Sequence, residues 1–245
     1  MKTMWQSHGK MTTCLLILLV YLILYSNTTS AQSLAKASIC DYQETRQNVP
    51  INPKTNKPYM PAERNQEPFA EASIKEEQIK ECLRANMNVP EDKYIPIRNH
   101  HIVFEEYLKA WKALAEEKKD YAIPLSIEGG VLHANTPYDK ETRVGGIGLW
   151  EFGDPKITNT SQLSEEERKT FGITKKDAPI VPISSNIRWE NVFIDTTVTS
   201  TGKDNNFTIF SNEVSFIFTT FNNIASFNSA IFKNYAYFNY TTFNN

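Results

Sequence analysis

The end of the chain, residues 208–245, repeats a phenylalanine at regular intervals, and this repeat constrains the fold more than any other feature. The spacing between successive phenylalanines alternates between six and five residues, so one unit is eleven residues long, and an asparagine returns once in every unit. The phenylalanines are Phe210, Phe216, Phe221, Phe227, Phe232, Phe238 and Phe243, and the asparagines are Asn212, Asn223, Asn234 and Asn245. A unit this short cannot enclose a core alone, so the repeat must fold by stacking unit on unit.

A small or β-branched residue precedes each phenylalanine by two positions, as Thr208 precedes Phe210 and Ala225 precedes Phe227. Side chains two positions apart lie on the same face of a strand, so each pair points toward a common interior. Stacked strands lie about 4.8 Å apart, which places the ring of one layer on the ring of the next. We therefore predict that the seven phenylalanines form the core of the repeat. We predict the four asparagines at its corners, because Asn tolerates the left-handed backbone conformation that a corner needs.

The same residues resemble the pentapeptide-repeat family, in which each five-residue unit begins with a small residue and carries Leu or Phe at its centre. The matching units are 214–218, 225–229 and 236–240. The resemblance implies a right-handed, four-sided β-helix. Every second unit has an extra residue, so a β-helix with turns of eleven or twenty-two residues is the alternative geometry. The last unit breaks off at Asn245, which leaves two readings open: another chain stacks there, or the sequence is a fragment of a longer repeat.

The N-terminal segment 1–31 has the three regions of a secretory signal. Two lysines precede an apolar run at residues 14–24, and small residues occupy positions 29 and 31, where a signal peptidase requires them. We therefore predict a signal peptide at 1–31 and an exported protein, in the periplasm, on the cell surface or outside the cell. The apolar run is shorter than the ~20 residues of a membrane-spanning helix. An uncleaved single-pass membrane anchor at residues 11–25 is the alternative.

Two cysteines remain after the predicted signal, Cys40 and Cys82, in a compartment that permits oxidation. We predict that they form a disulfide bond, and two free buried thiols are the alternative. Closing a loop of this length contributes about 4 kcal/mol in the chain-entropy description. Neither cysteine has a neighbouring base that would activate it, so the sequence predicts no catalytic thiol.

Between the predicted signal and the repeat, helical patterns come first and strand patterns come later. Prolines recur through residues 32–70, as in an extended segment. Apolar residues fall at helical spacing at 74–87 and more strongly at 101–120, and a capping box at Ser164 predicts a further short helix. The predicted strands are 122–132, 144–152, 180–183 and 187–198.

This order predicts an α+β fold, in which a small helix-plus-strand domain is followed by a short right-handed β-helix of the pentapeptide-repeat kind. The predicted segments are the signal peptide at 1–31, a proline-rich extended segment at 32–70, the small α+β domain at 71–200 and the β-helical repeat at 201–245. The small domain is expected to cap one end of the repeat.

We predict no catalytic residue, no metal site and no cofactor in this chain. The histidines His100, His101 and His133 have no carboxylate or cysteine at ligand spacing. The glycine-rich segment 145–148 lacks the lysine that a phosphate-binding loop needs. A formal net charge of -2 gives no basic field, so nucleic acid is not a predicted partner.

The sequence therefore predicts an exported, non-enzymatic structural or interaction protein that uses the stacked repeat as a binding or self-association surface. The predicted partner is a protein, a cell-surface polymer or a second copy of the chain, and a membrane only if the signal stays uncleaved. A glycan-active β-helix enzyme of the cell envelope is the alternative. In that alternative Glu128, Glu151 and Asp154 would supply acid–base chemistry, although nothing in the sequence pairs these carboxylates.

Overall fold

The computed structural model describes residues 39–41, 74–154, 158–174, 177–202 and 205–244, together with the backbone of residues 51–52 and 57–58. The chain divides into two compact units, residues 1–39 and 40–245, and the elements below belong to the second. The predicted signal peptide 1–31, the alternative anchor 11–25, most of segment 32–70 and Asn245 lie outside the described residues. Among the described helices, none combines the length and the apolar character needed to cross a membrane.

The three α-helices form where the sequence predicts helices, but residues 149–152, predicted as part of the strand 144–152, form a 3-10 helix instead. The α-helices are α2 (Glu76–Ala85), α3 (Phe104–Lys118) and α4 (Glu165–Thr170), and the short 3-10 helices are η3 (Glu91–Lys93), η4 (Leu149–Phe152) and η5 (Thr160–Gln162). The apolar positions of α3 recur at helical spacing, so that helix buries one face. At α4 the predicted capping box is present: the Glu167 backbone N–H donates to Ser164 Oγ at 3.1 Å, and the Ser164 N–H donates to the Glu167 carboxylate at 3.0 Å.

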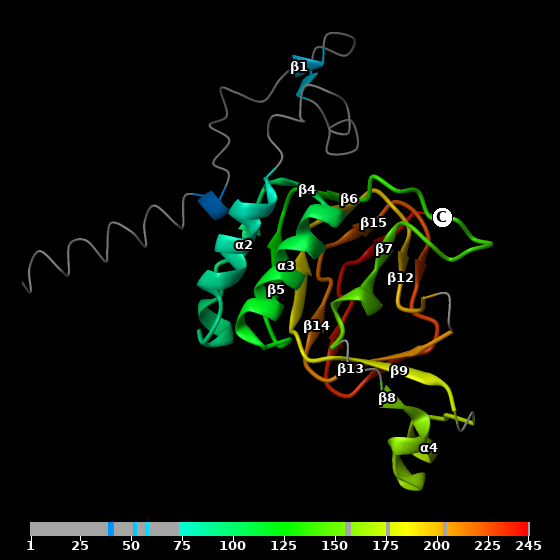
Figure 1. Ribbon diagram of the computed structural model, residues 1–245. Coiled ribbons are helices and arrows are strands. Elements are labelled where there is room, and N and C mark those ends of the chain that lie inside the picture. Colours follow the sequence, from blue (N-terminus) through cyan, green and yellow to red (C-terminus); the bar gives the residue numbers. More distant parts are fainter. Residues whose placement is uncertain are drawn as a thin grey trace, which may run out of the picture. The chain divides into compact units, whose positions relative to one another are not determined.

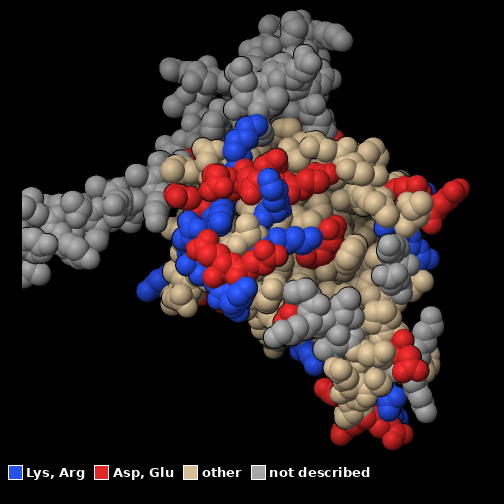
Figure 2. Space-filling model, viewed as in Figure 1, with Lys and Arg blue, Asp and Glu red and all other residues tan. Residues whose placement is uncertain are grey.

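The disulfide bond fastens the chain before the helical part to α2. The sulfur atoms of Cys40 and Cys82 lie 2.07 Å apart, so the predicted pairing is present. Cys82 is fully buried on α2, and α2 packs against α3. Figure 2 shows acidic and basic side chains interspersed over these two helices, with ion pairs such as Lys80 to Glu117 at 3.3 Å. A nucleic-acid-binding surface would carry a patch of basic side chains, and the described residues of this face form no such patch.

Most of the described strands are short and form four stacked sheets. Sheet 1 contains β3 (Ile97–Arg98), β5 (Leu125–Glu128), β10 (Ile187–Glu190), β14 (Val214–Ser215) and β18 (Ala236–Tyr237). Sheet 2 contains β4 (His101–Val103), β6 (Val131–His133), β11 (Phe193–Ile194), β15 (Thr220–Phe221) and β19 (Thr242–Phe243). Sheet 3 contains β7 (Ile147–Gly148), β12 (Val198–Thr199) and β16 (Ala225–Ser226). Sheet 4 contains β8 (Thr158–Asn159), β9 (Pro179–Ile183), β13 (Phe207–Phe210) and β17 (Ala230–Phe232).

Neighbouring strands of these sheets run parallel, except for the antiparallel pair β8 and β9. A separate antiparallel pair, β1 (Ile51–Asn52) and β2 (Lys57–Pro58), lies outside the four sheets. From β9 onward the chain visits sheets 4, 1, 2 and 3 in that order and then begins again, so that successive turns lie side by side in Figure 1. The result is a mixed α+β structure with repeated parallel strands, which is compatible with a β-helix-like repeat.

The strand register gives the length of each turn. Ile187 of β10 pairs with Val214 of β14, so one turn of the stack runs from Ile187 to Glu213. Val214 pairs in turn with Ala236 of β18, so the next turn runs from Val214 to Tyr235 and is shorter. This complete turn consists of two eleven-residue units, as in the longer of the two alternatives drawn from the sequence, and a partial turn with β18 and β19 follows it.

The sheets do not divide at the boundary expected between residues 200 and 201. Strands β10, β11 and β12 precede that boundary, yet each pairs with a strand of the phenylalanine repeat. Composition changes abruptly near Thr208, but backbone pairing does not depend on composition. The stack extends back to β3 and β4, within the segment that the sequence assigns to a separate small domain.

Helix α3 takes the place of strands in the first turn of the stack. The chain runs from β3 in sheet 1 to β4 in sheet 2, then through α3, and returns to sheet 1 at β5. The apolar face of α3 covers Phe152, whose ring centroid lies 5.4 Å from that of Trp111. Phe152 contacts Trp189, and Trp189 contacts Phe216 of the repeat. One aromatic core thus joins the helical end to the repeat.

Candidate binding surfaces and pockets

The phenylalanines of the repeat stack in columns, one turn above another. Phe210 lies on Phe232 with ring centroids 4.9 Å apart, and Phe221 lies on Phe243 with centroids 5.1 Å apart and planes within 4°. The stacked partners are two eleven-residue units apart in the chain, so each column follows the strand register. The predicted layer spacing of about 4.8 Å agrees with these distances.

The other three rings of the repeat fill the space between these columns. Phe216 contacts Phe238 with centroids 5.4 Å apart. Phe227 contacts rings on several sides, among them Phe216 at 5.8 Å and Phe238 at 5.3 Å. All seven phenylalanines therefore belong to one network of ring contacts, in which Phe210, Phe216 and Phe221 are buried.

The predicted asparagine corners differ from the sequence prediction. Asn212, Asn223 and Asn234 lie at bends, but none is among the residues with positive φ. The left-handed residues of the repeat are instead Phe218, Ser229 and Tyr240, each with φ of 57°. Each is the third residue of a four-residue turn, as where the Thr219 N–H donates to the Phe216 carbonyl at 3.1 Å. This hydrogen bond and a positive φ at the third position are typical of a type II turn, which fixes the conformation whatever side chain stands there.

Asn212 acts at its bend through its side chain rather than through its backbone conformation. Its amide nitrogen donates to the Ser184 carbonyl at 2.6 Å, which links it to the preceding turn of the stack. Asn234 accepts a hydrogen bond from the Tyr235 backbone N–H at 2.8 Å. The recurring asparagine is therefore a signal for a bend, but not for a left-handed corner.

The last described turn leaves one edge of each sheet without a strand partner among the described residues. Strands β16, β17, β18 and β19 each pair on one side. The core rings become more exposed toward this edge: Phe221 is fully buried, whereas Phe243 is 47% exposed. Outside the turn, the rings of Phe218 and Tyr240 stack at 4.8 Å and are both exposed.

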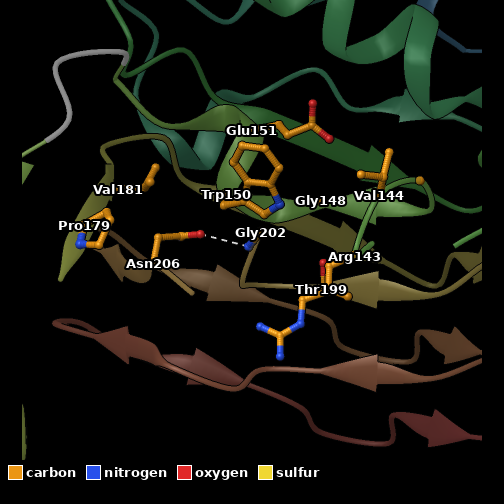
Figure 3. Close-up of a pocket in the computed structure, with 11 residues that line it drawn as sticks. Arg143, Val144, Gly148, Trp150, Glu151, Pro179, Val181, Thr199, Gly202 and Asn206 are labelled. Atoms are coloured by element: carbon orange, nitrogen blue, oxygen red, sulfur yellow. Dashed lines mark hydrogen bonds between the residues drawn. The ribbon is translucent and has the colours of Figure 1, made fainter. Parts of the chain in front are cut away.

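A cavity of about 320 Å³ lies beside η4, between the interrupted turns of the stack (Figure 3). Its residues come from β7 and the loop before it, from η4, from β9, and from β12 and the chain between β12 and β13. They are Arg143, Val144, Gly145, Gly148, Trp150, Glu151, Pro179, Val181, Thr199, Gly202 and Asn206. The half-buried indole of Trp150 lies at the centre of this view, with Glu151 on one side and Arg143 on the other. We call this cavity the Trp150 pocket.

Two glycines fix the position of the Trp150 ring. A Cβ atom on Gly202 would lie 2.8 Å from Cε2 of the indole, and a Cβ on Gly148 would lie 2.7 Å from its Nε1. Only glycine permits the backbone to approach so closely. The Oδ1 atom of Asn206, which is buried, accepts a hydrogen bond from the Gly202 N–H at 2.8 Å and holds that loop in place. The indole is thus seated by backbone on more than one segment.

Glu151 supplies the carboxylate of the pocket. Burial raises the pKa of Glu151 above its ordinary value, and the positive charge of Lys112 opposes this shift. The Lys112 ammonium lies 3.7 Å from the Glu151 carboxylate. Arg143, at the mouth of the pocket, donates to the Asn205 side chain. The pocket therefore contains one acidic and one basic side chain beside an aromatic ring.

A second, polar cavity of about 180 Å³ lies on the outer face of sheet 1. The register of β5 and β10 places Glu128 directly beside Glu190. Arg98 pairs with Glu128 at 2.9 Å, and Arg188 pairs with Glu190 at 3.2 Å. Glu190 is not among the predicted site residues, although both strands end in glutamate after alternating residues, Leu-Ser-Ile-Glu and Ile-Arg-Trp-Glu. That shared ending is the one trace of the pairing in the sequence, and it does not by itself set the register of the two strands.

The three acids considered for catalysis are not brought together. Glu128 lines the polar cavity of sheet 1, whereas Glu151 lines the Trp150 pocket, and the two cavities share no lining residue. Asp154 lines neither; its backbone N–H donates to the Pro182 carbonyl.

Two of the histidines do meet, which their sequence spacing did not predict. His101 Nε2 and His133 Nδ1 lie 2.7 Å apart, and their rings stack. Within the described residues no group of three histidine, cysteine or acidic side chains is placed to hold a metal ion.

No family model, no curated protein and no solved structure matches this chain. Function is therefore inferred from the two surfaces above, the free edge of the repeat and the Trp150 pocket.

Proposed function

We propose that this chain is an exported, non-enzymatic interaction protein that uses the last turn of its stacked repeat as a binding or self-association surface. The free edge of β16, β17, β18 and β19 carries the proposal, because it combines strand edges with the half-exposed ring of Phe243. Such an edge is the kind of surface on which another β-structure docks. The proposal includes a right-handed β-helix similar to pentapeptide repeats, supported by the ordered passage through four sheets.

Export is supported by two independent features. Residues 1–31 have the composition of a secretory signal. The Cys40–Cys82 disulfide is of a kind that persists in oxidising compartments outside the cytoplasm.

A second copy of the chain is the occupant that the structure favours for the free edge. Helix α3 covers the other end of the stack, so the free edge of one copy cannot continue onto that end of another. Two free edges that face each other give a closed two-fold dimer rather than a fibre. Between residues 222 and 244 the only charged side chain is Lys233, so the two edges meet with little repulsion.

Sedimentation velocity over a range of protein concentrations tests this proposal. We expect the wild-type chain to shift from monomer to dimer as its concentration rises. Phe243→Lys places a charge on the apolar edge and should keep the chain monomeric, because a charge opposes strand docking. Since Phe243 is already 47% exposed, this variant should fold.

Tyr240→Lys is the matched control, because Tyr240 lies in the same turn and is 77% exposed, but faces outward. It should dimerise as the wild type does. A wild-type chain that stays monomeric at every concentration, or a Phe243→Lys chain that dimerises normally, would contradict self-association through this edge. Deleting residues 208–245 is a poorer test, since it would uncover Trp189, which packs on Phe216.

A glycan-active enzyme is the second candidate, favoured by the register of Glu128 and Glu190. Neighbouring strands lie about 4.8 Å apart, close to the ~5 Å between the carboxyl groups of retaining glycosidases. Against it, an arginine holds each carboxylate, and a general acid needs a proton instead. The test is whether the chain releases reducing ends from cell-envelope polysaccharides. If it does, and if Glu128→Gln and Glu190→Gln each abolish the release, the glycan-active enzyme becomes the better proposal.

A further inference from the structure

We propose that the Trp150 pocket binds one sugar ring of an uncharged glycan. This site is separate from the free edge of the repeat, so it stands or falls independently of self-association. It also requires no hydrolysis, because a bound sugar needs only an apolar platform and hydrogen-bonding groups around it.

Trp150 provides the platform. The other two tryptophans of the described residues, Trp111 and Trp189, are at most 1% exposed and belong to the core. Trp150 is only half-buried, and its ring borders the cavity (Figure 3). Gly148 and Gly202 hold the ring at contacts that a Cβ would forbid, so little side-chain entropy is lost when a ligand packs on it. The C–H face of a pyranose ring is apolar and suits such an indole surface.

The polar groups of the pocket match the hydroxyl rim of a sugar. The Glu151 carboxylate accepts hydrogen bonds, the Arg143 guanidinium donates them, and the Thr199 hydroxyl does both. These groups come from separate segments and converge on one cavity, while Pro179 and Val181 keep the opposite wall apolar (Figure 3). A purely aromatic ligand would make no hydrogen bond with the Glu151 carboxylate or the Thr199 hydroxyl.

The charge balance of the pocket selects an uncharged ligand. Glu151 and Arg143 contribute one negative and one positive charge, and Lys112 already pairs with Glu151 at 3.7 Å. A cation would have to displace Lys112, and an anion would face the Glu151 carboxylate. The volume of about 320 Å³ lies at the small end of ligand sites, which fits one ring rather than a long chain.

Saturation-transfer NMR with the full chain tests this inference directly. The probes are methyl glycosides of the gluco, galacto, manno and N-acetylgluco configurations, with benzoate and tetramethylammonium as aromatic and cationic comparators. We expect at least one glycoside to receive saturation mainly on the ring protons of one face. Its affinity by titration calorimetry should be about millimolar, typical of a single sugar in an open site.

Three substitutions locate the site. Trp150→Ala should weaken the affinity for the glycoside about tenfold or more. Thr199→Val keeps the shape of a strand residue and removes only the hydroxyl, and Glu151→Gln keeps the size and removes the charge; each should weaken binding severalfold. Circular dichroism checks that each variant is folded. Phe243→Lys, which tests the free edge, should bind the glycoside as the wild type does.

The proposal is overturned if no glycoside receives saturation, or if benzoate or tetramethylammonium binds more tightly than every glycoside. It is also overturned if Thr199→Val and Glu151→Gln both bind the glycoside normally, because the sugar would then lie elsewhere. A Trp150→Ala chain that loses glycoside binding but still dimerises, and a Phe243→Lys chain that binds the glycoside but stays monomeric, would separate this site from the proposed function.

Discussion

The last turn of the stack and the turns before it use the same four sheets in different ways. The last complete turn, from Val214 to Tyr235, consists of two eleven-residue units with phenylalanine and asparagine at matching places, so its rings repeat in register. The preceding turn, from Ile187 to Glu213, is longer, and still earlier turns are interrupted by α3 and α4. The regular turns form columns of stacked rings and an edge of unpaired strands, whereas the interrupted turns leave a cavity.

The Trp150 pocket lies where the stack is interrupted. Most of its residues come from the loop before β7, from η4 and from the chain between β12 and β13, none of which belongs to the eleven-residue units. The regular turn offers its edge and its exposed aromatic rings instead. In this molecule the candidate ligand site therefore lies in the interrupted turns, whereas the candidate docking surface lies on the regular repeat.

The largest expected effect is the difference in stability lost when a phenylalanine is removed from the interior of the repeat or from its edge. Phe216 is fully buried and contacts both Trp189 and Phe238, so Phe216→Ala should lower the free energy of unfolding by about 3–5 kcal/mol. Phe243→Ala should cost only about 1 kcal/mol, because its ring is already half exposed. Urea unfolding of both variants measures the difference. Equal losses would mean that the last turn is as well buried as the turn beneath it, against the proposed free edge.

A smaller effect is expected at the interrupted turns, where Gly202 seats Trp150. Gly202→Ala would place its Cβ 2.8 Å from the indole, and such overpacking costs about 1–3 kcal/mol. It should also change the near-ultraviolet circular dichroism of Trp150. Gly172→Ala is the control: its φ of 64° makes Ala costly by about 1–2 kcal/mol, but no atom lies within 4 Å of its Cβ. A spectrum of Gly202→Ala that matches the wild type would show that Trp150 is not held by this glycine.

The regular part of the fold could be predicted from the sequence because its signal is local. Phenylalanines at fixed spacing, with a small residue two places earlier, predict inward-facing rings on short strands. Phe210, Phe221, Phe232 and Phe243 lie in strands, whereas Phe216, Phe227 and Phe238 directly follow β14, β16 and β18. The cysteine pair and the helices were predictable for the same reason. The backbone turn at Phe218 was not, since a hydrogen bond between residues 216 and 219 overrides the preference of the side chain.

The pocket could not be predicted, because its parts are distant in sequence. Trp150 and Gly202 meet only after the chain has completed a further turn, and Glu128 meets Glu190 only through the register of two strands. Neither the spacing nor the composition of these residues encodes that register. The same holds for the boundary predicted at residues 200 and 201, because the change in composition near Thr208 coincides with no change in strand pairing.

The smallest expected effect is a pH dependence confined to the interrupted turns. Burial raises the pKa of Glu151 in the folded chain, so the folded state keeps a proton that the unfolded state loses. Stability therefore falls as pH rises from the unfolded value, about 4.3 for glutamate, through the raised folded pKa. Glu151→Gln cannot ionise, and it should gain stability relative to the wild type between about pH 4 and pH 7. Lys112 offsets part of the effect, because its ammonium stabilises the carboxylate.

Thermal unfolding of the wild type and Glu151→Gln at both pH values measures this difference. Glu116→Gln is the control variant, because it removes a carboxylate from the exposed side of α3 without touching the pocket. If Glu151→Gln were instead relatively less stable at neutral pH, the ion pair with Lys112 would outweigh burial, and the carboxylate would be held for its charge. That result would mean that Glu151 is held by Lys112 and is less free to accept hydrogen bonds from a ligand. The interrupted turns would then offer a weaker ligand site than the contrast with the regular repeat suggests.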